Sequence, residues 1–139
     1  MTDRARGLLD TSVLVDFDLV DPEALPESSA VAAVTLAEPA AGPHATNDPA
    51  ERARRQDRLQ WVSATWDPLP FDADAARAYA RVYAEMRASG RTSRARLADL
   101  LIAATALAHE LPVYTRNAAD FAPLERLASV VPVATARLR

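Results

Sequence analysis

Residues 7–15 of the chain read GLLDTSVLV, with Asp10 as the only charged residue between two apolar segments. The residues before Asp10 predict a buried strand over 7–10, and those after it predict a helix over 12–20. A carboxylate at the end of a buried strand costs free energy unless hydrogen bonds or a cation offset its charge. Asp10 therefore indicates either a capped strand–helix junction or one member of a charged site.

Strand and helix signals alternate along the rest of the chain. Further strands are expected at 30–34, 112–115 and 130–133, with a minor strand at 69–71. Helices are expected at 36–41, 49–66, 72–88, 93–110 and 121–127, and the helix at 93–110 is apolar enough to be central. This alternation predicts an α/β fold with a parallel sheet covered by helices on both faces. Functional residues in such folds gather at the carboxyl ends of the strands.

Length and composition limit the possible classes of protein. A chain of 139 residues indicates a single domain, 1–139, with a core at about 7–134. The absence of Cys excludes disulfides, thiolate metal sites and Cys nucleophiles. No apolar stretch approaches the roughly 20 residues of a membrane span, and the first residues are too polar for a signal peptide. We therefore expect a cytoplasmic protein without membrane association.

The net charge and the type of basic residue both bear on the class of protein. The net charge of -3 argues against a general nucleic-acid coat protein, although it leaves room for a local basic face. All 16 basic residues are Arg, which binds phosphate and carboxylate groups in a bidentate manner. A codon bias accounts for the overall absence of Lys, so the count alone assigns no function.

Further acidic or amide residues share the apolar setting of Asp10. Glu38 follows VTLA, Asp99 lies within LADLLIAA, and Asn117 and Asp120 come directly after an apolar strand. Carboxylates that recur at the ends of apolar elements are typical of a hard-cation site that acts on phosphate esters. We predict a Mg²⁺ site with Asp10 and Asp99 as direct ligands and with Glu38 and Asp120 nearby. The metal would activate a water molecule against a phosphodiester.

Each of these residues also has an ordinary structural interpretation. Asp10 and Asp120 could be helix N-caps, and Glu38 could be an exposed residue of a first helical turn. Asp99 could cap a helix or form a salt bridge, and Asn117 could be a turn residue. The joint pattern favours a site, because independent caps have no reason to occur in this order and context.

Four segments carry a resemblance to a known family: LLDTSVLVD at 8–16, VTLAE at 34–38, ADLLIAATA at 98–106 and PVYTRNAADF at 112–121. Together they resemble the PIN-domain family and, within it, the VapC-type toxin ribonucleases. The resemblance implies a PIN-like three-layer α/β/α fold with a central parallel sheet. It also implies cleavage of RNA by an endonuclease that depends on Mg²⁺ or Mn²⁺.

The resemblance also implies roles for the acidic residues. Asp10 and Asp99 would be the main metal ligands, and Glu38 a ligand or a residue that positions water. Many relatives carry Asp where this chain has Asn117, so Asp120 is the candidate for the missing carboxylate. These five residues form the expected catalytic set.

A second set of residues is expected to support the substrate. The hydroxyls of Ser12 and Thr115 would lie next to the acidic residues. Arg94, Arg96 and Arg116 lie close in sequence to Asp99 or Asn117 and could hold RNA phosphates. An ordinary solvated loop explains these Arg residues equally well. The resemblance further implies an RNA substrate, a small cognate antitoxin that inserts a segment into the acidic cleft, and a homodimer.

Two other classes of function remain open at this point. Response-regulator receivers and phosphatases of the haloacid dehalogenase type also place Asp at the end of a first strand. Receivers normally need a Lys, which this chain lacks, and the phosphatases usually carry Asp at the position of Ser12. A PIN-like binding domain without catalytic activity is the other alternative, because Asn117 brings no negative charge.

Overall fold

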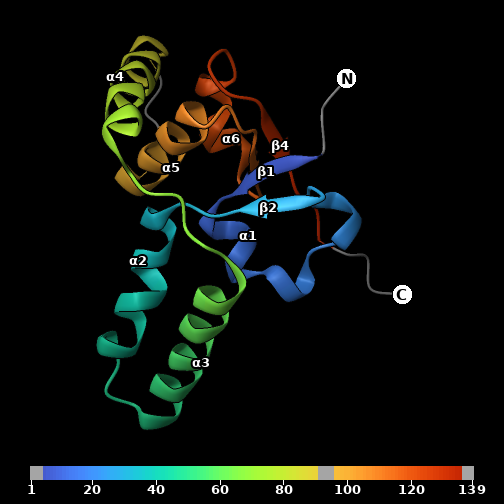
Figure 1. Cartoon of the computed structure of the whole chain (residues 1–139), viewed down its shortest axis with the longest axis vertical. Helices are drawn as coiled ribbons and strands as arrows, with labels where there is room; N and C mark the ends of the chain where they lie inside the picture. Colours follow the sequence, from blue (N-terminus) through green and yellow to red (C-terminus); the bar gives the residue numbers. More distant parts are fainter. Residues whose placement is uncertain (1–4, 91–95, 136–139) are drawn as a thin grey trace.

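Four parallel strands form the centre of the protein, whose computed structural model describes residues 5–90 and 96–135 (Figure 1). The strands lie in the order β2-β1-β3-β4 within one sheet. Their bounds are β1 Arg6–Leu9, β2 Ser28–Ala30, β3 Val113–Thr115 and β4 Val130–Pro132. All three neighbouring pairs are parallel, so the predicted parallel sheet is confirmed.

Helices cover both faces of this sheet. They are α1 Thr11–Val15, α2 Ala33–Ala41, α3 Pro49–Thr65, α4 Ala73–Ala88, α5 Leu97–Ala108 and α6 Ala118–Phe121. Short 3-10 turns lie at Phe17–Leu19, Pro22–Ala24, Gly42–Ala45 and Ala122–Leu124. Helices α2 and α3 project from the sheet as an arm closed by the Gly42–Ala45 turn (Figure 1). No helix in the described part of the chain is long and apolar enough to cross a membrane.

The sheet separates two hydrophobic cores because successive side chains of a strand point to opposite faces. Leu8 and Val113 belong to the core shared with α4, α5 and α6, whereas Leu9 and Tyr114 belong to the core shared with α1. All four side chains are almost completely buried. This arrangement confirms the three-layer α/β/α architecture.

Helix α5 is the most buried helix, as its apolar sequence predicts. Residues Ile102 through Ala106 are all buried, and three of them are alanines that allow neighbouring elements to approach closely. The helix begins at Leu97, and Arg96 has an extended backbone at the N-cap position. The predicted start at residue 93 lies outside the described residues.

Several element boundaries differ from the sequence prediction. The strand expected at 30–34 is β2 at Ser28–Ala30, and α2 already begins at Ala33. Val31 and Ala32 are buried and the other Val and Ala residues of this segment are partly buried, so their apolar pattern does not separate the end of a strand from the start of a helix. The expected strand at 69–71 forms only an isolated bridge between Leu69 and Ala32.

Two predicted helices are also shorter or shifted. The helix expected at 12–20 ends at Val15, and a separate 3-10 turn follows at Phe17–Leu19. The helix expected at 121–127 is instead α6 at Ala118–Phe121 followed by a 3-10 turn. In the second segment Pro123 lies at the start of the 3-10 turn, where its missing N–H interrupts the α-helical hydrogen bonds.

Gly7 is required by the packing of Tyr114 across the sheet. A Cβ atom at Gly7 would lie 2.3 Å from Cε1 and 2.5 Å from Cδ1 of the Tyr114 ring. Tyr114 is fully buried, so its ring has no space into which it can move. We expect Gly7→Ala to lower the free energy of unfolding by about 1–3 kcal/mol, as overpacking does in other cores. Urea unfolding measures this change.

Gly42→Ala provides the matched control for this substitution. Its added Cβ would meet Arg55 Cδ at 3.5 Å, an ordinary contact, and the backbone is already helical there. Equal stabilities of the two variants would contradict the proposed packing constraint.

Candidate functional site

The candidate site lies where the sheet changes its direction of winding. The chain passes from β1 to β2 on one side and returns to β3 on the other side of β1. Ligand sites of parallel α/β sheets form at such a switch point, beyond the carboxyl ends of the strands. Asp10 follows β1 here, and its backbone N–H donates a hydrogen bond to the Tyr114 carbonyl of β3 over 3.0 Å.

Asp10 is a buried carboxylate with three hydrogen-bond donors. The residue is only 3% exposed, and its Oδ1 accepts a hydrogen bond from the backbone N–H of Ser12 at 3.0 Å. Oδ2 accepts the hydroxyls of Ser12 at 3.0 Å and of Thr115 at 2.5 Å. Asp10 is thus the N-cap of α1, as its structural interpretation predicts. Because a carboxylate oxygen can accept two bonds and Oδ1 accepts one from the described residues, Oδ1 offers one further position for a cation.

The loop after β3 fixes the orientation of both hydroxyls. Ser12 Oγ accepts the backbone N–H of Arg116 at 3.0 Å, and Thr115 Oγ1 accepts that of Asn117 at 2.9 Å. Each hydroxyl has one proton, which it gives to Asp10. The backbone of β3 and its loop therefore sets the position of the Asp10 carboxylate.

A cleft of about 380 Å³ opens above Asp10. It brings together seven of the residues expected from the sequence, together with three that were not: Asp10, Thr11, Ser12, Val15, Asp16, Glu38, Arg96, Asp99, Asn117 and Asp120. All five residues of the expected catalytic set line this one cleft.

The other expected residues take different positions. Thr115 is buried beneath the cleft and reaches it through Asp10. Arg116 is not among the lining residues, and its guanidinium pairs with Asp16. Arg94 lies outside the described residues.

Asp16 is the charged lining residue that the sequence analysis missed. It is the C-cap of α1, the short helix whose N-cap is Asp10. Both residues belong to the LLDTSVLVD segment at 8–16, in which Asp10 is the third residue and Asp16 is the last. The helix expected at 12–20 placed Asp16 in the interior of that helix, because the break after Val15 was not predicted.

Asp99 has a raised pKa. Burial is the main cause, and the negative charges of Asp10 and Asp120 add to it, while Arg96 opposes it through its backbone N–H and its charge. Asp99 Oδ2 accepts that N–H at 2.9 Å, so the residue also caps α5. Its carboxylate therefore lies in a partly buried, negatively charged environment.

Two of the structural alternatives for acidic residues are wrong. Glu38 lies in the second half of α2 rather than in its first turn, and its Oε1 is 3.3 Å from Arg96 Nη1. Asp120 lies inside α6, where Asn117 occupies the N-cap position. Neither carboxylate is explained by capping.

The charges of the cleft divide into paired and unpaired groups. Arg96 pairs with Glu38 and Arg116 pairs with Asp16. Within residues 5–90 and 96–135, no salt bridge involves Asp10, Asp99 or Asp120. Three carboxylates of the cleft thus form no salt bridge with any Arg side chain in the described part of the chain.

These carboxylates fit a hard divalent cation by the chemistry of their oxygen donors. No three side chains of His, Cys, Asp or Glu in the described part of the chain are placed closely enough to hold a metal together. Mg²⁺ typically uses one or two carboxylates and retains several waters, so this spacing is compatible with its coordination.

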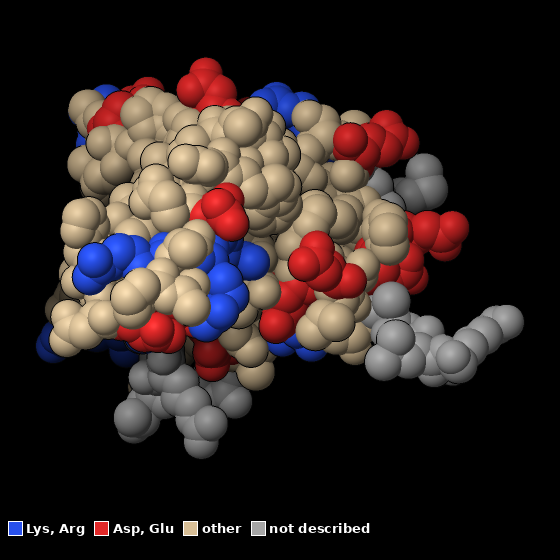
Figure 2. Space-filling view, turned by 90° about the horizontal axis from the view of Figure 1, so that it is seen from below, with Lys and Arg blue, Asp and Glu red and all other residues tan. Residues whose placement is uncertain are grey.

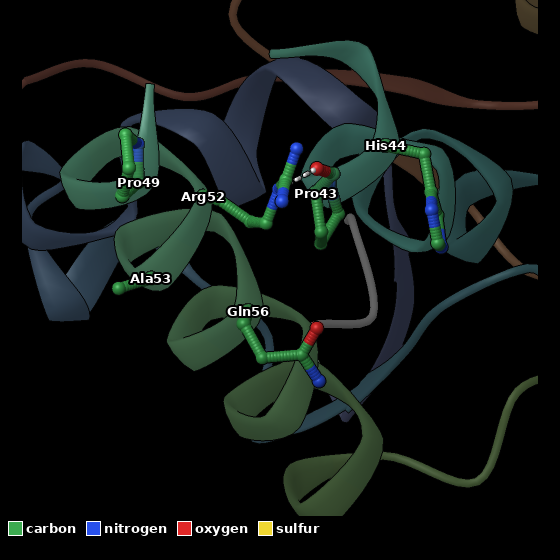
Figure 3. A pocket seen from close by; sticks show the side chains of 6 residues that line it. All are labelled: Pro43, His44, Pro49, Arg52, Ala53 and Gln56. Carbon is green, nitrogen blue, oxygen red and sulfur yellow. Dashed lines mark hydrogen bonds between the residues drawn. The ribbon is translucent and has the colours of Figure 1, made fainter. Parts of the chain in front are cut away.

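A second hollow lies at the tip of the α2–α3 arm (Figure 3). It measures about 550 Å³ and is lined by Pro43, His44, Pro49, Arg52, Ala53 and Gln56. Arg52 donates to the Pro43 and Thr46 carbonyls at 3.1 and 2.9 Å, which holds the turn together. The lining holds no carboxylate, so the chemistry of Asp10 has no counterpart there.

Surface charges at this end of the molecule are interspersed. Figure 2 shows Arg side chains next to groups of Asp and Glu, rather than one broad field of a single sign. Glu51, for example, pairs with both Arg54 and Arg55 on α3. The negative cleft is therefore a local feature.

Comparison with known proteins agrees with this geometry. The family model described as PIN domain matches residues 7–127. Ribonuclease VapC5 of Mycobacterium tuberculosis is 42% identical over 132 residues, covering 93% of this chain and 95% of the relative. Ribonuclease VapC8 of the same organism is 39% identical over 101 residues, covering 72% and 89%.

A solved structure shares the fold as well. The crystal structure of VapBC-5, a member of the VapBC family of toxin-antitoxin systems from M. tuberculosis, has a TM-score of 0.78 at 42% identity. The alignment covers 91% of this chain and 95% of that one. The chain belongs to the PIN-domain family, in its branch of VapC-type toxin ribonucleases. The resemblance inferred from the four sequence segments is confirmed.

The raised pKa of Asp99 predicts how this residue affects stability. A folded-state pKa above the ordinary value of 3.8 means that stability falls as the pH rises through the interval between the two values. At pH 7 the ionised carboxylate therefore destabilises the metal-free fold. We expect Asp99→Asn, which can still accept the Arg96 N–H, to raise Tm by a few degrees in EDTA.

The same variant should respond differently to pH and metal. Its advantage over the wild type should disappear in acid, below the unfolded pKa, and Mg²⁺ should raise Tm only for the wild type. Thermal unfolding across pH measures both effects. Equal Tm values in EDTA at pH 7 would contradict the electrostatic destabilisation.

Proposed function

We propose that this chain is the toxin of a type II toxin–antitoxin pair and cleaves RNA phosphodiester bonds with the help of Mg²⁺, or of Mn²⁺. The observation that carries the proposal is the cleft in which Asp10, Asp99 and Asp120 lie together and form no salt bridge with the residues that the structure describes. The kinship with proteins named ribonucleases supports the choice of RNA as substrate.

The cleft residues divide the catalytic work between them. A divalent cation, when bound, supplies an activated water and offsets charge on the phosphate. Asp10 would hold it with the free position of Oδ1, and Asp99 and Asp120 would contribute carboxylate oxygens or bind its waters. Asn117 would donate its amide to a phosphate oxygen, in place of a further negative charge.

Glu38 and Arg96 lie at the exposed side of the cleft, where substrate enters. Their side chains are 52% and 63% exposed, so their ion pair is screened by water and readily opened. A phosphate that binds the Arg96 guanidinium would release Glu38. The freed carboxylate can then orient a water and accept its proton.

The acidic cleft also bears on the protein partners that we propose for this chain. The related VapBC-5 structure is described as a toxin–antitoxin system, and we propose a small antitoxin for this chain too. A basic segment of that antitoxin would compete with the metal for the unpaired carboxylates. We also propose that the toxin forms a homodimer and acts in the cytoplasm, where its RNA substrate is found.

The geometry disfavours a phosphotransfer function. Oδ2 of Asp10 already accepts two hydroxyls and cannot carry a phosphoryl group without losing them. The chain also has no Lys to stabilise such a phosphoryl group.

Cleavage of a mixed RNA substrate tests the proposed function. The wild type should cleave with Mg²⁺ or Mn²⁺ and stop in EDTA. Asp10→Asn and Asp99→Asn should each lower the cleavage rate by about 100-fold or more. Loss of a residue that only supports a metal ligand already lowers activity by about 10–100-fold. Asp74→Asn, on the exposed face of α4, is the control and should cleave normally. Undiminished cleavage by both folded site variants would rule out the proposed metal site.

A further inference from the structure

Arg116 contacts both ends of helix α1. At the N-terminal end, its backbone N–H donates to Ser12 Oγ at 3.0 Å, and that hydroxyl donates to Asp10 Oδ2 at 3.0 Å. At the C-terminal end, its guanidinium Nη1 pairs with Asp16, the C-cap of the same helix. One residue of the β3 loop thus spans the short helix that begins at the proposed metal ligand.

The ion pair has little freedom to rearrange. The Arg116 side chain is 26% exposed and that of Asp16 is 36% exposed. The Arg116 Nε is buried and has no hydrogen-bond partner among the described residues, where Asp16 is the one carboxylate that pairs with the guanidinium. Loss of Asp16 would leave a partly buried cation unpaired, which costs more than the loss of an exposed pair.

We infer that Asp16 is a positioning residue for the proposed metal site, acting through Arg116 and Ser12 on the Asp10 carboxylate. The inference rests on the proposed function, because it concerns how well Asp10 is oriented for a cation. Asp16 holds the guanidinium, and the guanidinium anchors the loop. The anchored loop keeps the Arg116 N–H on Ser12, so the single Ser12 proton stays on Asp10 Oδ2 and leaves the free position of Oδ1 directed to the cleft.

A simple charge effect makes a different prediction. If these residues acted only through space, removing the negative Asp16 would weaken binding of a cation, whereas removing the positive Arg116 would strengthen it. A positioning role instead requires that loss of Asp16 and loss of Arg116 each weaken binding of the cation. The two substitutions together should then weaken it no more than one alone, because either one opens the same contact.

Mn²⁺ binding provides a readout apart from RNA cleavage. Titration of the full chain with Mn²⁺, followed by the electron paramagnetic resonance of the free ion, gives Kd. We expect Asp16→Asn and Arg116→Met each to raise Kd by about 10-fold, as residues that support metal ligands do. The double variant should match the singles, and Asp16→Glu should recover much of the affinity.

An exposed ion pair of the same type serves as the control. Asp74 and Arg77 of α4 pair at 2.6 Å with side chains 74% and 73% exposed, and neither lines the cleft. Asp74→Asn and Arg77→Met should leave Kd unchanged. Thermal unfolding confirms that each variant is folded before its Kd is compared.

The outcomes separate this inference from the proposed function. Tighter Mn²⁺ binding by Arg116→Met, or unchanged binding by Asp16→Asn, would overturn the positioning role while the metal site stands. A wild type that binds no Mn²⁺ would overturn both. Weaker binding by both single variants, with no further loss in the double variant, supports the inference.

Discussion

The hydrogen bonds that Ser12 and Thr115 donate to Asp10 are the interaction on which the site depends. They join β1, α1 and β3 at one buried carboxylate, whose negative charge would otherwise be costly in this position. The backbone N–H groups of the next loop complete the arrangement by binding the same hydroxyls. Fold and site are therefore coupled, since a shift of β3 against β1 would remove the Thr115 donor from Asp10 and the Arg116 N–H from Ser12.

The sequence predicted the architecture well because its signals were long or strongly patterned. Helix α5 was recognisable from an apolar run with few polar residues, and α4 from its spacing of Ala and Tyr. The start of α3 was predicted by Asp48 and Pro49, and Asp48 does accept the Ala50 N–H. Boundaries failed at β2, where a few apolar residues suit either a strand or a helix, and after Val15, where a 3-10 turn replaces the expected α-helix.

The site was predictable in its membership but not in its internal pairing. Carboxylates at the ends of apolar elements were identified from sequence, and folding gathers them in one cleft. Which carboxylates are neutralised depends on side chains from distant elements, such as Arg96 of the α5 N-cap against Glu38 of α2. Asp16 was missed for this reason, because its partner Arg116 is 100 residues away in the sequence.

This pairing changes how an acidic cleft of this kind is interpreted. Five carboxylates line it, and two of them have a guanidinium partner, whereas Asp10, Asp99 and Asp120 form no salt bridge with any residue of 5–90 or 96–135. The raised pKa of Asp99 is consistent with this division, since Asp10 and Asp120 are the carboxylates that contribute to it. An Asn at position 117 is then no deficit: a fourth unpaired carboxylate would raise the cost of folding without metal, whereas an amide adds a donor for phosphate at no such cost.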